Sequence, residues 1–205
     1  MGRRCTFHSV ERPLRPIITP VGVAKNPRLT KPDTKFLEAG VYGVSLVISA
    51  DAAKPVIAMI DAEMNAASEL AKKDNPRVRV KAADKPYRWV ANDADEPTGK
   101  VLFTFKMRAS GIDRETKQPW ERRPPLFDAK GKPLTNKEIG AGSEIKVAFT
   151  MGQFYHPLVG AGVSLRVQAV QLIKLVKLSG DGDAACFGFV SEEGCSQHKA
   201  PLDGQ

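Results

Sequence analysis

The hydrophobic positions of this chain recur with two different periods. Every second residue is apolar in KVLFTFKMRA, residues 100–109, which predicts a half-buried β-strand whose opposite face is basic at Lys106 and Arg108. Between residues 51 and 74 the apolar side chains recur every three or four positions. This spacing predicts an amphipathic helix that is capped by Asp51 and ended by Asn75–Pro76.

Other stretches with alternating or β-branched residues predict further strands. They are residues 40–49, 77–82, 85–93, 140–155 and 160–178. The last stretch has a helix-compatible composition, but its β-branched alternation and glycine-rich start favour a strand. PLFDAKGKPL, residues 125–134, predicts a hairpin, and residues 110–125 form a polar connection rich in turn formers. Five or six strands with one helix indicate a small, partly open antiparallel barrel.

The length of 205 residues suits one domain with tails. We expect this domain at residues 19–178, after a flexible arm at 1–18 and before a disordered, mildly acidic tail at 179–205. No stretch approaches the roughly 20 apolar residues of a membrane span, and the N-terminus lacks the apolar core of a secretory signal. Three cysteines argue against a disulfide framework and fit a reducing cytoplasm.

The net charge of +8 is unevenly distributed along the chain. Residues 1–36 and 77–132 each carry a net charge of +6, whereas residues 37–76 between them carry −3 and residues 179–205 carry −4. Two basic zones favour an anionic partner, either nucleic acid or a membrane surface.

Patterns typical of enzymes are missing from the sequence. There is no glycine-rich phosphate loop, no nucleotide-binding GxGxxG and no GxSxG around a serine nucleophile. Cys5-x2-His8 and Cys195-x2-His198 could together supply four zinc ligands. Both pairs lie in the predicted tails, so unpaired cysteines and solvated histidines are the better interpretation, and we expect no metal or other cofactor.

Basic and aromatic side chains are interleaved through the predicted strands. Single-stranded nucleic acid is bound by a positive groove and by rings that stack on its bases. The candidate rings are Tyr87, Trp89, Phe103, Phe105, Trp120, Phe127, Phe154 and Tyr155. Alternation assigns Phe103, Phe105 and Phe149 to the core, because inward-facing rings fill small barrels. Tyr155, near a strand end, and Trp120, in a polar connection, are the better exposed candidates.

The cationic candidates outside the N-terminal zone form stripes. They are Arg77, Arg79, Lys81, Arg88, Lys106 and Arg108. The first three share one face of the strand predicted at 77–82, and the last two share the polar face of 100–109. Such stripes are often only solvated faces, but two of them beside aromatic rings favour a surface that binds nucleic acid.

The order of these features resembles the single-stranded DNA-binding proteins of T7-like and related tailed phages. Three blocks carry the resemblance: residues 19–48, TPVGVAKNPRLTKPDTKFLEAGVYGVSLVI; the hairpin PLFDAKGKPL; and residues 139–175, IGAGSEIKVAFTMGQFYHPLVGAGVSLRVQAVQLIKL. The resemblance implies a mainly β fold, a five-stranded antiparallel OB-fold barrel with one inserted helix.

The resemblance also implies a function. It implies sequence-independent binding of single-stranded DNA in phage replication and recombination, in the cytoplasm of the bacterial host, without catalysis or a membrane. In that family the loop tyrosine and a lysine of the preceding strand contact DNA, which correspond to Tyr155 and Lys146 here. Four N-terminal cations would line the edge of the groove: Lys25, Arg28, Lys31 and Lys35. The family pattern allows a homodimer and recruitment of phage DNA polymerase and helicase through the C-terminal tail, although this tail lacks the usual long acidic run and terminal aromatic.

Two alternatives stay open from sequence. An RNA-binding OB module would use the same stacking surface, because rings accept bases of either sugar. A structural or assembly protein of the phage particle would use its basic face only for solubility.

Overall fold

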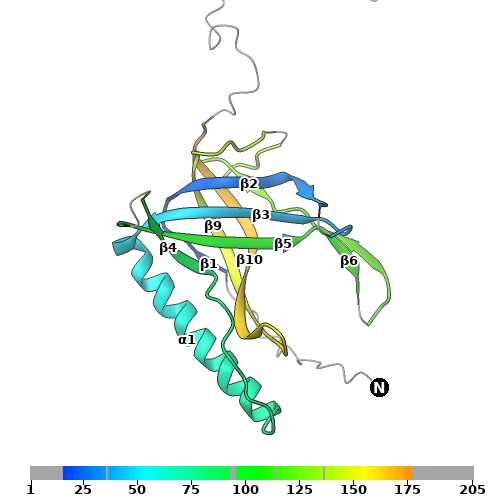
Figure 1. Ribbon diagram of the computed structural model, residues 1–205. Coiled ribbons are helices and arrows are strands. Elements are labelled where there is room, and N and C mark those ends of the chain that lie inside the picture. Colours follow the sequence, from blue (N-terminus) through cyan, green and yellow to red (C-terminus); the bar gives the residue numbers. More distant parts are fainter. Residues whose placement is uncertain (1–15, 36, 93–95, 114, 136, 177–205) are drawn as a thin grey trace, which may run out of the picture.

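The structure is a computed structural model, and it describes residues 16–176 apart from residues 36, 93–95, 114 and 136 (Figure 1). The main sheet contains β1 (Ile17–Ile18), β2 (Gly22–Asp33), β3 (Val41–Ser49), β4 (Tyr87–Ala91), β5 (Pro97–Arg108), β8 (Leu126–Phe127), β9 (Glu144–His156) and β10 (Gly160–Lys174). β6 (Ser110–Ile112) and β7 (Pro119–Glu121) form a separate hairpin, and α1 (Ala50–Asp74) follows β3.

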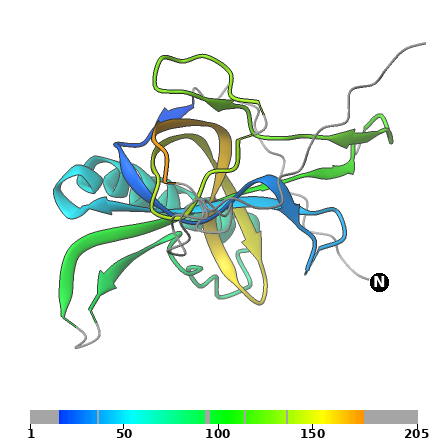
Figure 2. The ribbon, with the colours of Figure 1, turned by 90° about the horizontal axis from the view of Figure 1, so that it is seen from above.

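The long strands of the main sheet pair in a circuit. β9 pairs with β2, β2 with β3, β3 with β5, β5 with β10, and β10 again with β9. The β5–β10 pairing is parallel, and the other pairings in this circuit are antiparallel. Seen from above, these strands curl around one another, while the β4–β5 and β6–β7 hairpins extend outward (Figure 2).

The mainly β architecture with one helix agrees with the sequence, but the expected number of five strands is too low. β1 and β8 have two residues each, too few to show an alternating pattern. β6 and β7 arise within the polar connection, where the ring of Trp120 packs directly against Gly111. Short strands of this kind depend on contacts made by distant parts of the chain.

The strand predicted at residues 77–82 does not form. Residues 75–86 connect α1 to β4, and only Ala82 makes a bridge, to Ala161 of β10. Residues 77–81 form no ladder with a neighbouring strand, although the Lys81 carbonyl accepts from the N–H of Ala161 in β10.

The helix begins and ends close to the predicted positions. Ser49 occupies the N-cap position without a side-chain hydrogen bond, and Asp51 lies in the first turn, so Asp51 as the cap was wrong. A carboxylate in the first turn is still favourable, because the N-terminal end of a helix is electropositive. Asn75 ends the helix as expected, and its backbone N–H donates to the carbonyl of Ala71.

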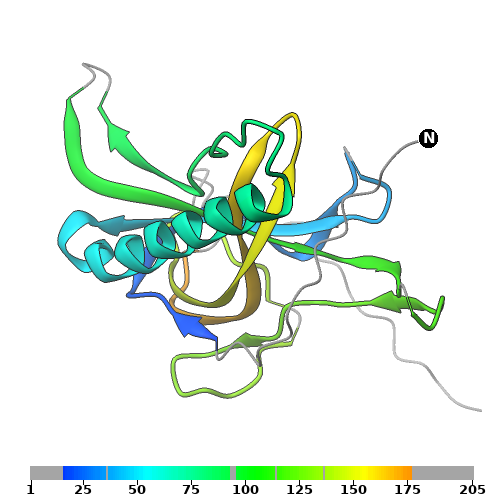
Figure 3. The same ribbon diagram turned by 90° about the horizontal axis from the view of Figure 1, so that it is seen from below.

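The buried side of α1 closes one end of the curled sheet (Figure 3). Its buried residues are Ala53, Val56, Ile60, Met64, Ala67 and Ala71. The helix contacts β3, β5, β9 and β10. No helix in the described part of the chain is long and apolar enough to span a membrane.

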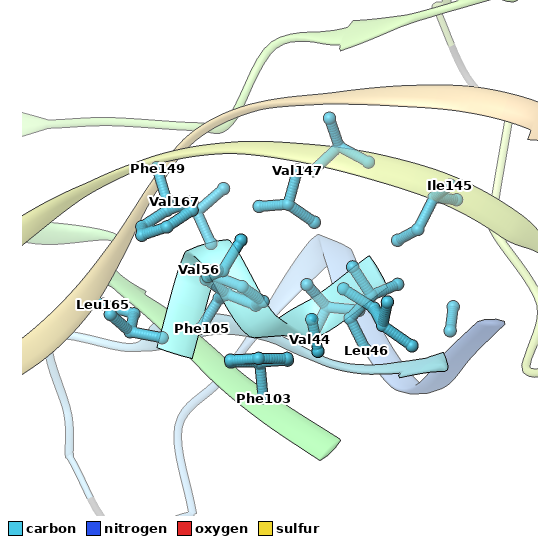
Figure 4. Close-up of a cluster of buried hydrophobic side chains, with 14 of the residues drawn as sticks. Val44, Leu46, Val56, Phe103, Phe105, Ile145, Val147, Phe149, Leu165 and Val167 are labelled. Atoms are coloured by element: carbon cyan, nitrogen blue, oxygen red, sulfur yellow. The ribbon is translucent and has the colours of Figure 1, made fainter. Parts of the chain in front are cut away.

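Aromatic rings fill the centre of the core (Figure 4). Phe103, Phe105 and Phe149 are each 0% exposed, which confirms their assignment to the core. The ring centroids of Phe105 and Phe149 are 5.1 Å apart, and those of Phe103 and Phe105 are 6.3 Å apart. The inward positions of β5 and β9 are therefore occupied by packing, and only the outward positions of these strands remain for a ligand.

Candidate nucleic-acid interface

A row of cations crosses the outer face of the main sheet. Arg28 of β2 lies opposite Gly43 of β3, Gly43 lies opposite Lys106 of β5, and Lys106 lies beside Arg166 of β10. Partners in register on adjacent strands point to the same side of the sheet. The row therefore places three positive side chains across four neighbouring strands, with a glycine in the middle.

A bulge in β2 brings Lys25 onto the same face. Lys25 and Arg28 are three residues apart, so a regular strand would point them to opposite faces. Asn26 has a φ of +47°, and the β2–β3 register shifts between Lys25 and Arg28. As a result Lys25 pairs with Ser45 and Arg28 pairs with Gly43, two positions that share a face of β3.

Further cations extend this surface along β5 and β4. Arg108 pairs with Val41, and Arg88 pairs with Leu102, both at outward positions. We call the resulting surface the cationic face; its members are Lys25, Arg28, Arg88, Lys106, Arg108 and Arg166. All six are exposed. Of these six residues, Arg28 alone has an ion pair within the described part of the chain, with Asp33 at 3.3 Å. The charges of the other five are therefore available to an anion.

Two glycines leave space above the sheet on the cationic face. A Cβ added to Gly43 would meet only the carbonyl oxygen of Phe105 within 4 Å. The Arg166 guanidinium lies directly over Gly152, where an added Cβ would be 2.7 Å from its atoms. A side chain at either position would occupy space that a bound chain or the Arg166 side chain could otherwise use.

A shallow cavity of about 450 Å³ opens beside the row, where β4 and β10 meet along β5; we call it the crevice. The side chains of Ser45, Thr104 and Ser164 bring hydroxyl groups to it, and Pro86 and Leu102 bring apolar surface. Its basic lining residues are Lys85, Arg88 and Lys106. Apolar surface next to hydroxyls and cations suits a nucleotide, which presents a flat base, a sugar and a phosphate.

One of these lysines is tied to the helix. The Lys85 ammonium donates to the Tyr87 hydroxyl at 2.8 Å and lies 3.0 Å from Oδ1 of Asp61 on α1. The Tyr87 hydroxyl in turn donates to Asp61 at 2.9 Å. The hydrogen bonds to the Tyr87 hydroxyl and to Asp61 raise the pKa of Lys85 above its ordinary value.

Phe154 and Tyr155 lie on opposite faces of β9. Phe154 pairs with Gly162, and its ring covers that glycine on the side where Gly152 and Arg166 lie. Tyr155 shares its side with Gln153, whose amide donates to Glu63 of α1 at 2.9 Å. The ring that continues the cationic face is therefore Phe154, while the sequence had favoured Tyr155.

The remaining predicted residues lie around the cationic face. Lys146 is on the outer side of β9, about 13 Å along the strand from Thr150, the neighbour of Arg166. Lys31, at the end of β2, is 3.5 Å from Glu138, and Lys35 lies just beyond that strand. Trp120 is less available than expected, because Gly111 packs against its ring and the Arg122 guanidinium lies 4.6 Å from the ring centroid.

The connection between α1 and β4 carries the other predicted cations. Arg77, Arg79 and Lys81 are exposed, but they do not share a strand face. The Lys81 carbonyl accepts from the N–H of Ala161, which places this end of the connection beside the β9–β10 hairpin. Lys81 therefore lies toward the Phe154 end of the cationic face.

Sequence reasoning missed two residues of this site. Arg166 occupies an outward position in β10, but it is the only charge between residues 160 and 173 and carried no stripe signal. Lys85 precedes a proline, and no pattern indicated its contact with Asp61, 24 positions earlier. The cysteines and histidines weighed as zinc ligands lie outside the described residues, which contain no cluster of three or more His, Cys, Asp or Glu suited to a metal.

Comparison with known proteins identifies relatives among the single-stranded DNA-binding proteins of phages. The family model described as single-stranded DNA-binding protein, bacteriophage T7, matches residues 21–175. The single-stranded DNA-binding protein of Enterobacteria phage T3 is 31% identical over 171 residues, which cover 76% of this chain and 73% of that protein. The corresponding protein of Escherichia phage T7 is 33% identical over 107 residues, 51% of this chain and 46% of its own length.

Solved structures share the fold. The crystal structure of gp2.5, a single-stranded DNA-binding protein of bacteriophage T7, has a TM-score of 0.70 at 26% identity, and the match covers 90% of this chain and 100% of that one. The single-stranded DNA-binding protein of bacteriophage Enc34, in complex with single-stranded DNA, has a TM-score of 0.55 at 16% identity, covering 81% and 90%. The likeness to the Enc34 protein is one of fold alone.

Proposed function

This chain belongs to the bacteriophage T7 family of single-stranded DNA-binding proteins, and we propose that it binds single-stranded DNA without sequence preference across the cationic face. It acts in phage DNA replication and recombination and carries out no catalysis. Phosphates would be neutralised by the exposed cations, and bases would stack on an adjacent ring.

The observation that carries this proposal is the row formed by Arg28, Lys106 and Arg166. Adjacent strands are about 4.8 Å apart, so the row spans the sheet at a spacing that a flexible phosphate backbone can follow. The sheet surface is open, with Gly43 in its centre. An open strip of cations suits a single strand, whose bases are free to turn toward the protein.

Phe154 is the stacking ring in this proposal. It is partly exposed and lies on the side of β9 that carries Gly152, next to Arg166. Tyr155 would contribute if the DNA continues around the end of the β9–β10 hairpin. Lys81, Arg79 and Arg77 flank that hairpin, while Lys25, Lys31, Lys35 and Lys146 extend the surface at the other end.

The five long strands suggest an OB-fold barrel. β2, β3, β5, β9 and β10 each pair with two others of this set, and α1 covers one end of the curled sheet. OB-folds bind single strands across the outer face of their sheets, which is where the cationic face lies.

Further parts of the proposal concern partners. The family pattern supports a homodimer, as well as recruitment of phage DNA polymerase and helicase through residues 179–205, which lie outside the described residues. The place of action would be the cytoplasm of the infected bacterial host.

The experiment is a titration of labelled oligothymidylate, followed by polarisation of the label and by quenching of Trp89, which is 56% exposed. We expect the single strand to bind more tightly than a duplex of equal length at low salt. Equal affinity for the two forms contradicts the proposal. Oligouridylate that competes as well as oligothymidylate would favour an RNA-binding module, and no binding to either would favour a structural protein of the phage particle.

A further inference from the structure

Lys85 differs from the other basic residues that line the crevice. Within the described residues, Lys85 is paired with a carboxylate, whereas Arg88 and Lys106 have no ion pair. Its partner, Asp61, comes from α1, which otherwise contributes to the core and not to the DNA-binding surface. The contact therefore links the helix to the crevice through one charged side chain.

Three contacts hold the Lys85 ammonium in place. It lies 3.0 Å from the Asp61 carboxylate, 2.8 Å from the Tyr87 hydroxyl and 5.1 Å from the Tyr87 ring centroid. Tyr87 cannot leave easily, since its ring packs against Phe103 with centroids 5.9 Å apart. The aliphatic stem of Lys85 thus borders the crevice while its charge is directed to Asp61.

We propose that Asp61 is a positioning residue that holds the Lys85 ammonium against α1, and thereby limits how tightly the crevice binds single-stranded DNA. This inference rests on the proposed function. A phosphate near Lys85 meets a lysine and a carboxylate only 3.0 Å apart, whose charges nearly cancel at that distance. Lys85 consequently adds little to phosphate neutralisation in the native protein.

Removal of the Asp61 charge should release the lysine. The lysine stem has several rotatable bonds, so the ammonium can turn toward the crevice once its carboxylate partner is neutral. Each additional phosphate contact steepens the dependence of log affinity on log salt by about 0.7 for single strands. Such a limit on affinity would keep the protein removable from the strand it covers.

The experiment compares the salt dependence of oligothymidylate binding for Asp61→Asn, Glu63→Gln, Lys85→Met and the double variant Asp61→Asn/Lys85→Met. Asparagine keeps the size of aspartate and can still accept the Tyr87 hydrogen bond. Glu63→Gln is the matched control, because it removes one negative charge from the same helix, two residues away, where Glu63 accepts from Gln153 and has no ion pair among the described residues.

We expect Asp61→Asn to bind more tightly at low salt, with a slope steeper by about 0.7, while Glu63→Gln stays near the native slope. Lys85→Met should leave the slope unchanged, and the double variant should lose the gain of Asp61→Asn. Two outcomes would overturn the inference: equal steepening in Asp61→Asn and Glu63→Gln, or a flatter slope in Lys85→Met alone, which does not depend on how Asp61→Asn folds. A native protein that binds no oligothymidylate overturns the proposed function itself, whereas native binding with an unchanged Asp61→Asn slope overturns only this inference.

Discussion

Replacement of both Lys106 and Arg166 by methionine removes two neighbouring charges from the centre of the cationic face. The two residues are in register on β5 and β10, and neither has an ion pair among the described residues. Methionine keeps much of the aliphatic length of each side chain, and both positions are exposed, so the core should be unaffected. The variant therefore tests charge and not folding.

The size of the effect follows from the number of free cations. The cationic face has six members, and Arg28 shares its charge with Asp33, which leaves five. If each contacts one phosphate, the slope of log affinity against log salt is about −3.5 for the native protein. An increase from about 50 to 200 mM salt then weakens binding roughly 100-fold. The double variant has about three such contacts left, so its slope is about −2.1 and the same salt change costs roughly 20-fold.

Polarisation of a labelled oligothymidylate at four or more salt concentrations measures both slopes. The matched control is Lys73→Met/Lys130→Met, which removes two exposed lysines at the end of α1 and in the loop after β8. We expect the control to keep the native slope. The assignment of the cationic face is refuted if Lys106→Met/Arg166→Met keeps the native slope, or if the control flattens it equally.

Three further outcomes are expected. Phe154→Ala should weaken binding of single strands by about 1–3 kcal/mol with an unchanged salt slope, and Tyr155→Ala should weaken it less; the reverse order in the same titration would place the stacking on the other face of β9. Phe149→Ala should lower the free energy of unfolding by about 3–5 kcal/mol, measured by urea denaturation, and a loss near zero would contradict its place in the core. Gly160→Ala should be more destabilising than Gly131→Ala in the same assay: both glycines have positive φ, but an added Cβ at Gly160 collides with the Lys81 carbonyl, whereas Gly131 has nothing within 4 Å. Equal losses would mean that only the φ strain matters.

Local pattern was enough to locate most of the long elements. The alternation in residues 100–109 predicted β5, and the helical spacing of residues 51–74 predicted α1 almost to its ends. It also assigned Phe103 and Phe105 to the core, because their side of β5 is apolar throughout. These signals work because side-chain direction repeats every 2 residues in a strand and every 3.6 in a helix.

The same alternation in residues 77–82 predicted a strand that is absent. Arg77, Val78 and Arg79 have the right spacing, but Val78 is 54% exposed and the segment forms no ladder with another strand. A strand requires a partner, and pairing depends on where the rest of the chain has placed its edges. Periodicity in one segment contains no information about that.

The sequence likewise did not predict which cations lie together on one face. Lys106 and Arg108 are neighbours in one strand, so the sequence grouped them; Arg28 and Arg166 are 138 positions apart. The bulge at Asn26 and the register of four strands bring both onto the face of Lys106. The choice between Phe154 and Tyr155 also depended on strand parity, since adjacent residues of β9 point to opposite sides.

Composition and local pattern were sufficient to predict a mainly β chain with one amphipathic helix, core positions for the rings on β5 and β9, and basic zones that suit an anionic partner. These properties depend on composition and on the direction of side chains within one element. The row of Arg28, Lys106 and Arg166 and the contact of Asp61 with Lys85 follow from the three-dimensional fold. Register between strands and contacts between a helix and a connection are set by non-local packing, and short-range patterns do not encode them.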